Sequence, residues 1–233
     1  MKNLAIIPAR GGSKGIPRKN IKNLLDKPLI AWTIEQALLS KNIDRVIVST
    51  DDKEIAEVAL KYGADVPFMR PSELSVDTAA TEPCMTHAIN WLEVNEKYFC
   101  DNVVLLQATS PVRRKTSIDN AFGLFYNSNA DSLVSVCEFW HFLWENRNVP
   151  KALYNFQNRP RRQDIKPEDI KLKENGSIYI TNKEKFMSAE NRLVGNICAY
   201  VMDELESFEI DTMLDWQIIE TILKNTDLGI SSC

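Results

Sequence analysis

Cysteine and histidine are scarce in this chain, and their scarcity argues against several kinds of site. The five cysteines among 233 residues are scattered at spacings typical of neither a zinc site nor a disulfide framework, so we expect reduced thiols. The two histidines, His87 and His141, lie far apart in the sequence, which leaves a histidine-based triad or metal site with little support. We interpret both histidines as structural.

Long apolar runs and an excess of positive charge are also missing. No apolar run approaches the roughly 20 residues that a membrane-spanning helix needs, and the apolar N-terminal stretch stops at Pro8, too early for a signal peptide. With 28 basic and 32 acidic side chains the net charge is −4, which gives no electrostatic reason to bind nucleic acid or an anionic membrane. We expect a cytoplasmic protein in which any anion site is local.

The chain does contain alternating strand and helix patterns, with 44% hydrophobic and 26% charged residues, as is ordinary for a globular protein. Strands are expected at residues 4–7, 45–49, 103–106, 132–136, 177–181 and 198–201, and helices at 28–40, 52–62, 81–96, 116–127 and 211–224. Either Asp51 or Asp52 is expected to cap the second helix. The alternation predicts an α/β fold, a mostly parallel, doubly wound, Rossmann-like sheet in one domain covering residues 1–233.

Residues from about 139 to 170 break this pattern with aromatic, proline and charged residues. A stretch of that length without periodicity is usually functional or an interface. Its aromatic residues, among them Phe139, Trp140, Phe142 and Trp144, could form a base-stacking platform, but burial against a second subunit is favoured because large aromatics are enriched at interfaces. We expect a protruding insertion that makes a homodimer.

A basic loop follows the first expected strand. Residues 10–22 contain five cations, Arg10, Lys14, Arg18, Lys19 and Lys22, and no acid. Neither G-x-G-x-x-G nor G-x-x-x-x-G-K-[ST] occurs, which weakens a dehydrogenase or P-loop ATPase interpretation. In an open α/β sheet, ligands collect beyond the carboxyl ends of the strands, and glycines let backbone N–H groups approach phosphate. The loop therefore predicts a polyphosphate site; the alternative is a solvated surface turn.

The string from Ala9 to Asn20 resembles the signature of the acylneuraminate cytidylyltransferase family, the CMP-sialic acid synthetases. Further segments match that family in order, at residues 70–79, 105–111, 161–164, 175–179 and 210–212. The resemblance implies a nucleotide-diphospho-sugar transferase-like fold and transfer of CMP from CTP to the anomeric hydroxyl of a nonulosonic acid, with Mg²⁺ as cofactor and pyrophosphate as the second product.

The resemblance also assigns site residues. Those implied for CTP are Arg10, Gly12, Ser13, Lys14, Lys19, Asn20, Arg70, Ala79 and Thr81. Among them Arg10 and Lys19 would bind the triphosphate, where fixed cations stabilise the developing negative charge, and Asn20 would read cytosine. For the sugar acid, Arg162 would bind the carboxylate, which the arginine fork suits, with Gln107 and Tyr179 as neighbours. The alternative is that Arg159, Arg161 and, less so, Arg162 belong to a solvated charged loop.

The chain departs from the family at its metal position. The family pattern usually reads Asp-Ile-Asp, whereas here it is Glu209-Ile210-Asp211. Carboxylates two residues apart in an extended segment point to the same side. We expect Asp211 to bind Mg²⁺ directly and Glu209 to act through water or as the base; both are candidate catalytic residues with Arg10 and Lys19. The alternative is that Asp211 caps the following helix.

Two other functions remain open at this stage. The segments at 161–163 and 175–179 favour nine-carbon acids over 3-deoxy-octulosonic acid, which a related cytidylyltransferase uses. A catalytically silent nucleotide-binding module on the same fold is the alternative of another class. Which acid is used, N-acetylneuraminic, legionaminic or pseudaminic, is not determined by the sequence.

Overall fold

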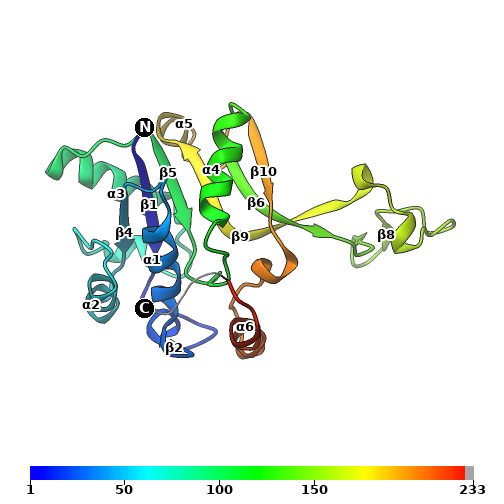
Figure 1. Cartoon of the computed structure of the whole chain (residues 1–233), viewed down its shortest axis with the longest axis horizontal. Helices are drawn as coiled ribbons and strands as arrows, with labels where there is room; N and C mark the ends of the chain where they lie inside the picture. The colour runs from blue at the N-terminus through cyan, green and yellow to red at the C-terminus, as the bar shows by residue number, and fades with distance from the viewer. Residues whose placement is uncertain (229–233) are drawn as a thin grey trace.

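The computed structural model describes residues 1–228 as a six-stranded sheet covered by helices on both faces (Figure 1). The strand order is β10-β6-β9-β5-β1-β4. The bounds are β1 (Asn3–Pro8), β4 (Arg45–Ser49), β5 (Asn102–Leu106), β6 (Ser132–Phe139), β9 (Lys171–Asn182) and β10 (Ile197–Val201). All neighbours are parallel except those of β9, which is antiparallel to both β5 and β6. The expected mostly parallel α/β sheet is confirmed.

Alternation along the strands builds two cores. In β1, Ala5 and Ile7 belong to one apolar cluster, while Leu4 and Ile6 belong to the other, because successive strand side chains point to opposite faces. The helices are α1 (Leu29–Leu39), α2 (Lys53–Lys61), α3 (Thr81–Glu96), α4 (Ser117–Asn127), α5 (Lys183–Ala189) and α6 (Met213–Asn225). Helices α1, α2 and α4 supply the first cluster, and α3 and α5 the second. In the part of the chain described, no helix is long and apolar enough to cross a membrane.

Two elements differ from the sequence expectation. The strand expected at 177–181 is only the second half of β9, which begins at Lys171. Its first four residues are exposed and its next seven buried, so the first half lacks the apolar run by which a strand is recognised. Helix α5 was not predicted, because within it only Phe186 is buried and a single buried residue gives no helical period.

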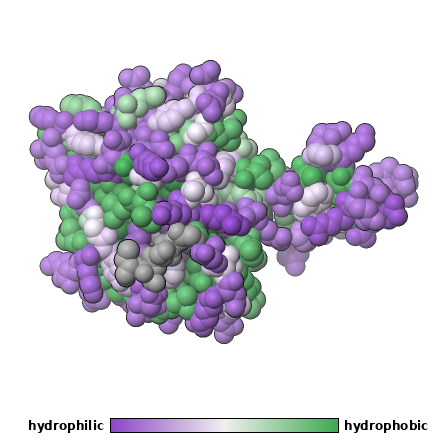
Figure 2. Space-filling model, viewed as in Figure 1, coloured by the Kyte–Doolittle hydropathy of each residue, from purple (hydrophilic) through white to green (hydrophobic). Residues whose placement is uncertain are grey.

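The region expected as an insertion projects from the sheet as an arm (Figure 1; Figure 2). The arm is the segment from the end of β6 to the start of β9. It contains the short strands β7 (Trp144–Glu145) and β8 (Lys151–Ala152), which pair with each other. Its aromatic rings contact one another, as in the pair Phe142 and Tyr154 with ring centroids 4.5 Å apart. A second two-stranded ribbon, β2 (Asn23–Leu24) with β3 (Lys27–Pro28), follows the basic loop.

Candidate active site

A cleft of about 390 Å³ opens where β1 and β5 end. This is the edge at which parallel α/β sheets bind ligands. The loop after β1, the segment before α3, the end of β5 and Asp211 line it together. Predicted site residues that line the cleft are Arg10, Ser13, Lys14, Lys19, Asn20, Arg70, Ala79, Thr81, Gln107 and Asp211. The structure thus gathers most of the residues expected around CTP in one place.

Two cations of the basic loop share one carboxylate. Arg10 Nη1 and Lys14 Nζ each lie 2.8 Å from an oxygen of Asp77. The hydrogen bond from Lys14, together with the nearby Arg10, lowers the pKa of Asp77. The Lys14 side chain is 73% exposed, so a polyphosphate can reach it from solvent. No role was predicted for Asp77, and only its place in the segment 70–79 could have suggested one.

The other end of the basic loop packs against the segment before α6. Lys19 Nζ donates to the carbonyl oxygen of Ile210 at 2.6 Å and lies 3.5 Å from Asp211 Oδ1. A Cβ atom on Gly15 would collide with the carbonyl oxygen of Asp211, so this position needs glycine. By contrast, a Cβ on Gly12 would meet nothing within 4 Å, and Gly12 does not line the cleft.

Asn20 holds the loop in shape from inside. It is 7% exposed, and its Nδ2 donates to the carbonyl oxygen of Arg10 at 3.0 Å. The Nδ2 group of Asn20 is therefore already engaged in a hydrogen bond within the protein. The Oδ1 atom, which forms no hydrogen bond among the described residues, is the atom of Asn20 that can accept from an exocyclic amino group.

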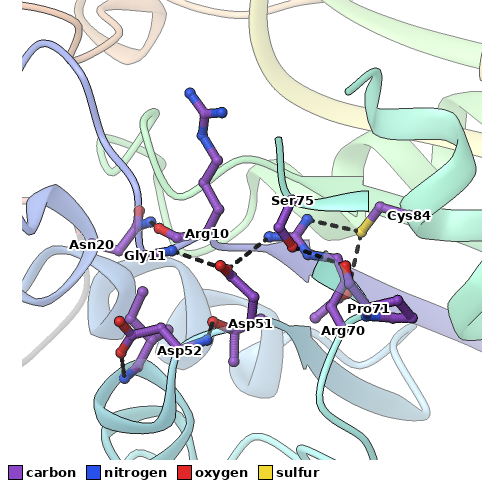
Figure 3. Close-up of polar contacts among 12 residues, drawn as sticks. Arg10, Gly11, Asn20, Asp51, Asp52, Arg70, Pro71, Ser75 and Cys84 are labelled. Carbon is purple, nitrogen blue, oxygen red and sulfur yellow. Dashed lines mark hydrogen bonds and ion pairs between the residues drawn. The ribbon is translucent and has the colours of Figure 1, made fainter. Parts of the chain in front are cut away.

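Arg70 lines the cleft, and Figure 3 shows its guanidinium between Asp51 and Cys84. The residue is 7% exposed, its Nη1 donates to Cys84 Sγ at 3.3 Å, and its Nη2 lies 3.7 Å from Asp51 Oδ1. Asp51 in turn accepts from the backbone N–H of Gly11 at 3.0 Å. The Nε and Nη2 atoms of Arg70 have no hydrogen-bond partner in residues 1–228. Because buried donors are costly when left unpaired, they suit a ligand with acceptor oxygens or nitrogens.

Asp52, and not Asp51, caps α2. Its side chain accepts from the backbone N–H of Ile55 at 3.0 Å and pairs with Arg18. The hydrogen bond from Arg18 lowers the pKa of Asp52 against the opposing effect of burial. A Cβ atom on Gly11 would stand 2.6 Å from Asp52 Oδ2. The two neighbouring aspartates therefore fasten the basic loop to the start of α2 in different ways.

Gln107, Gly176 and Glu209 lie close together beside the cleft. Gln107 Oε1 accepts from the Thr109 hydroxyl at 3.4 Å. Gly176 has φ +63°, and a Cβ atom there would overlap Glu209 Oε1 and stand 3.5 Å from Gln107 Nε2. The site thus requires glycine at 176 for both its backbone angle and this close approach. Burial, and then the charge of Asp211, raise the pKa of the half-buried Glu209.

Asp211 is not the helix cap. Thr212 is the N-cap residue of α6 and forms a capping box with Asp215. The side chain of Asp211 is 79% exposed and contacts Lys19 through one oxygen at 3.5 Å, so its carboxylate is accessible to a ligand in the cleft. Among residues 1–228, no three His, Cys, Asp or Glu side chains are grouped to hold a metal ion. Any cation held here would need other ligands.

Tyr179 lies outside the cleft. It is 3% exposed within the core beneath α3, and its hydroxyl donates to Glu174. The Arg192 guanidinium stands 4.9 Å from the centre of its ring. Burial and the hydrogen bond to Glu174 raise the pKa of Tyr179 well above its usual range. The structure therefore does not bring this predicted sugar-acid neighbour to the cleft surface.

Arg162 lines a second, smaller cavity of about 170 Å³ at the base of the arm. Its guanidinium lies 5.2 Å from the centre of the Trp140 ring. Lys173 lines the same cavity; it escaped the sequence analysis because an isolated lysine on a strand carries no signal. Phe208 lines the second cavity and Asp211 the cleft. The segment 208–211, with Glu209 in it, therefore runs between the two.

Comparison with solved structures gives the fold. CMP:2-keto-3-deoxy-manno-octonic acid synthetase in complex with CTP matches with a TM-score of 0.70 and 19% identity over 96% of this chain and 99% of the other. A 4-diphosphocytidyl-2C-methyl-D-erythritol synthase matches with a TM-score of 0.71 and 12% identity, over 95% of this chain and 98% of the other. Both share the fold of this chain over nearly its whole length, so the expected fold class is confirmed.

Sequence comparison is more specific. A pseudaminic acid cytidylyltransferase of Campylobacter jejuni is 35% identical, over 96% of this chain and 97% of the relative. A CMP-N,N'-diacetyllegionaminic acid synthase of Legionella pneumophila is 34% identical with the same coverage. An N-acylneuraminate cytidylyltransferase of Escherichia coli is 33% identical, over 95% of this chain but 52% of the relative. The family model described as Cytidylyltransferase matches residues 4–222, and the chain belongs to this cytidylyltransferase family.

Proposed function

We propose that this protein transfers CMP from CTP to the anomeric hydroxyl of a nonulosonic acid and releases pyrophosphate. The observation that carries the proposal is the cleft in which Arg10, Lys14 and Lys19 stand together with the exposed carboxylate of Asp211. Relatives that act on pseudaminic, legionaminic and N-acylneuraminic acids support the substrate class.

The basic loop would bind the triphosphate. Arg10 and Lys14 would exchange the carboxylate of Asp77 for phosphate oxygens, and Lys19 would approach the same group from the other end of the loop. Fixed cations at these positions would stabilise the charge that develops on the α-phosphate and the leaving pyrophosphate. Ser13 and the backbone at Gly12 would complete the loop around the phosphates.

The base and ribose would lie against Arg70, Asn20, Ala79 and Thr81. The two Arg70 donors that lack a hydrogen bond and the free acceptor of Asn20 are complementary to a base that offers both an acceptor and an amino group, as cytosine does. A base that could not satisfy both sets would leave buried groups unpaired, and that penalty is what gives such a site its selectivity.

The sugar acid would extend from Gln107 past Glu209 to the cavity of Arg162. There Arg162, with Lys173 beside it, would bind the carboxylate, while Glu209 would lie close to the anomeric hydroxyl and accept its proton directly or through water. Tyr179 would contribute by holding Glu174 rather than by contacting the acid. In this arrangement the hydroxyl attacks the α-phosphorus in line with the departing pyrophosphate.

Mg²⁺ fits the donor set. An exposed carboxylate in a cleft built for polyphosphate is the setting Mg²⁺ favours, because this ion keeps several waters and takes phosphate oxygens with one or two carboxylates. Asp211 would hold the ion directly and Glu209 through water. Bound there, Mg²⁺ would supply neutralisation of the phosphate oxygens.

The test is pyrophosphate release from CTP with a panel of acids: N-acetylneuraminic, legionaminic, pseudaminic and 3-deoxy-octulosonic acid. Turnover with a nine-carbon acid supports the proposal and names the substrate. Turnover with the eight-carbon acid alone supports the related octulosonate activity instead. CTP binding by calorimetry with no pyrophosphate from any acid would overturn the proposal and favour a silent nucleotide-binding module.

We also propose that the arm makes a homodimer and that the enzyme acts in the cytoplasm, where CTP is made. Trp144 and Phe156 on the arm are 53% and 60% exposed, which is costly for large apolar side chains in a monomer and typical of an interface. Light scattering should give a mass about twice the 26.6 kDa of the chain. Replacing both aromatics by serine should shift that mass toward one chain.

A further inference from the structure

Arg113 is a wholly buried arginine with no carboxylate beside it. Its exposed fraction is 0%, and it forms no ion pair within the described residues. Nη1 donates to Thr33 Oγ1 at 3.2 Å and to Gln36 Oε1 at 2.9 Å, both on α1. Nη2 donates to the carbonyl oxygens of Gln107 at 3.0 Å and Ser177 at 2.9 Å. All four acceptors are uncharged.

A buried cation without a counter-ion is an expensive way to hold a core together. Burial lowers the pKa of Arg113 to about 9, against the opposing influence of the Glu206 carboxylate. An apolar side chain of similar size would avoid this desolvation cost but would leave the four acceptors of Arg113 without a donor. Two of these acceptors are backbone oxygens at strand ends beside the cleft, and their positions point to a role beyond packing.

Arg113 forms hydrogen bonds with the residues just beyond the end of the β5–β9 ladder. The last paired residues of that ladder are Leu106 and Ile178, and the next position on each strand is Gln107 and Ser177. Instead of continuing the ladder, the carbonyl oxygens of these two residues both accept from Arg113 Nη2. One guanidinium thus joins the two strand ends at the point where they reach the cleft.

Both strand ends carry residues in the part of the cleft proposed to bind the sugar acid. The Gln107 side chain lines the cleft, and Ser177 follows Gly176, which faces Glu209 Oε1 and Gln107 Nε2. A shift of either strand end would change the separation of Gln107 from Glu209. A displacement of about 1 Å at such a site can cost up to about 100-fold in rate.

We propose that Arg113 is a positioning residue that fixes Gln107 opposite Glu209 and thereby sets the geometry of the sugar-acid half of the cleft. This inference rests on the proposed function for the identity of the acceptor. It does not involve the CTP half, because no hydrogen bond of Arg113 reaches the basic loop or Arg70.

The experiment compares Arg113→Lys and Arg113→Met with Ile34→Ala. Lysine keeps the charge but loses the fork geometry, and methionine removes the buried charge together with the donor of all four hydrogen bonds. Ile34 is buried in α1 and its side chain forms no hydrogen bond with this network. Its variant is therefore a control that loses stability without changing the hydrogen bonds of Arg113. We expect both Arg113 variants to raise the KM for the sugar acid by about 10-fold or more, with the KM for CTP within about twofold. Ile34→Ala should change neither.

A second readout is independent of turnover: the side-chain amide resonance of Gln107 in a ¹H–¹⁵N spectrum, assigned with Gln107→Asn. This resonance should shift in both Arg113 variants and stay in place in Ile34→Ala. If wild-type protein turns over no acid, the proposed function fails while this spectrum still decides the role of Arg113. An unmoved Gln107 resonance, or equal changes in both KM values, would overturn the inference.

Discussion

Lys19 is tied to Ile210, a residue 191 positions further along the chain, through a 2.6 Å hydrogen bond from its Nζ to the backbone carbonyl. The Lys19 side chain is 13% exposed, whereas that of Arg10 is 32% exposed and, among residues 1–228, forms an ion pair with Asp77 alone. Two cations of one loop that were expected to act alike on the triphosphate are therefore held in different ways. Lys19 also fastens the loop to the segment before α6.

This difference separates the two alanine variants. Both Arg10→Ala and Lys19→Ala should lower turnover by about 100-fold or more, because each removes a fixed cation from the phosphates. Arg10→Ala should leave the melting temperature nearly unchanged. Lys19→Ala should lower it by at least about 2 °C, since a hydrogen bond from a partly buried charge is lost. Calorimetry and a pyrophosphate assay measure the two effects; near-normal turnover in either variant would contradict the assignment.

Local pattern was enough to predict the sheet and most helices. The buried run in β5 and the helical period of α1 are properties of short segments, and they specify these elements without knowledge of the rest. The first half of β9 was missed because its side chains are exposed, so pairing with β6, not burial, makes it a strand. Its antiparallel direction follows from the chain returning along the arm.

The site was only partly predictable for a related reason. Arg10, Lys14 and Lys19 lie in one loop, and their concentration is visible in the sequence. The contacts of Arg113 with Gln107 and Ser177 join three separate segments. No local sequence pattern predicts that these segments lie together. For Tyr179 the resemblance implies a role beside the sugar acid, and the structure adds what the sequence alone does not give: the ring is buried and the hydroxyl donates to Glu174.

Arg162 and Arg161 are adjacent but differently placed. Arg162 lines the second cavity, whereas Arg161 is 73% exposed and pairs with Asp164 three residues away. Arg162→Ala should raise the KM for the sugar acid by about 10-fold or more, with little change in the KM for CTP, because a carboxylate partner is lost. Arg161→Ala is the matched control and should leave both near wild type. Equal effects of the two variants would assign both arginines to a solvated loop.

Asp52 links the basic loop to stability at neutral pH. Its pKa is lowered from 3.8 by the hydrogen bond from Arg18. A carboxylate with a lowered pKa in the folded state contributes stability that is present above the unfolded pKa and is lost as the pH falls through the folded one. Asparagine still caps a helix but carries no charge. Asp52→Asn should therefore be less stable than wild type at neutral pH, by about 1 kcal/mol or less because Arg18 is 40% exposed.

The stability difference between Asp52→Asn and wild type should shrink as the pH falls below the unfolded value of 3.8 and should vanish once the pH is below the lowered pKa of the folded state. Denaturant unfolding at neutral and strongly acidic pH measures it. Asp26→Asn, at a position where no ion pair occurs in the described residues, serves as the control. A difference between Asp52→Asn and wild type that does not depend on pH would show that the Arg18 pair is not its source.

Asp77 competes with phosphate for Arg10 and Lys14. Because its carboxylate must leave both cations before a triphosphate can bind them, Asp77→Asn should lower the Kd for CTP, by up to about fivefold as expected of an exposed pair. The gain should shrink at high salt, which screens the pair in wild type. Glu73→Gln removes a neighbouring acid that forms no ion pair in residues 1–228 and should leave the Kd unchanged. Weaker CTP binding by Asp77→Asn would mean that this carboxylate orients the cations for phosphate.

The metal assignment depends on which carboxylate faces the phosphates. Asp211 is exposed in the cleft, whereas Glu209 is half-buried against Gly176. Asp211→Asn should lower Mg²⁺-dependent turnover by about 100-fold or more, because a neutral amide is a poor Mg²⁺ ligand. Glu209→Asp keeps a carboxylate and should retain substantial activity. A titration of turnover against Mg²⁺ concentration measures both.

A control variant separates metal binding from helix capping. Thr212→Ala breaks the capping box with Asp215 and should lower the melting temperature, since a lost cap costs about 0.5–2 kcal/mol. Its dependence on Mg²⁺ should stay that of wild type, because Thr212 does not line the cleft and Asp215 still accepts from the backbone N–H of Asp211. Asp211→Asn should show the opposite pattern, with the melting temperature retained and the Mg²⁺ response lost. If Asp211→Asn instead behaved like Thr212→Ala, its carboxylate would serve the start of α6 and the ion would have to be held elsewhere.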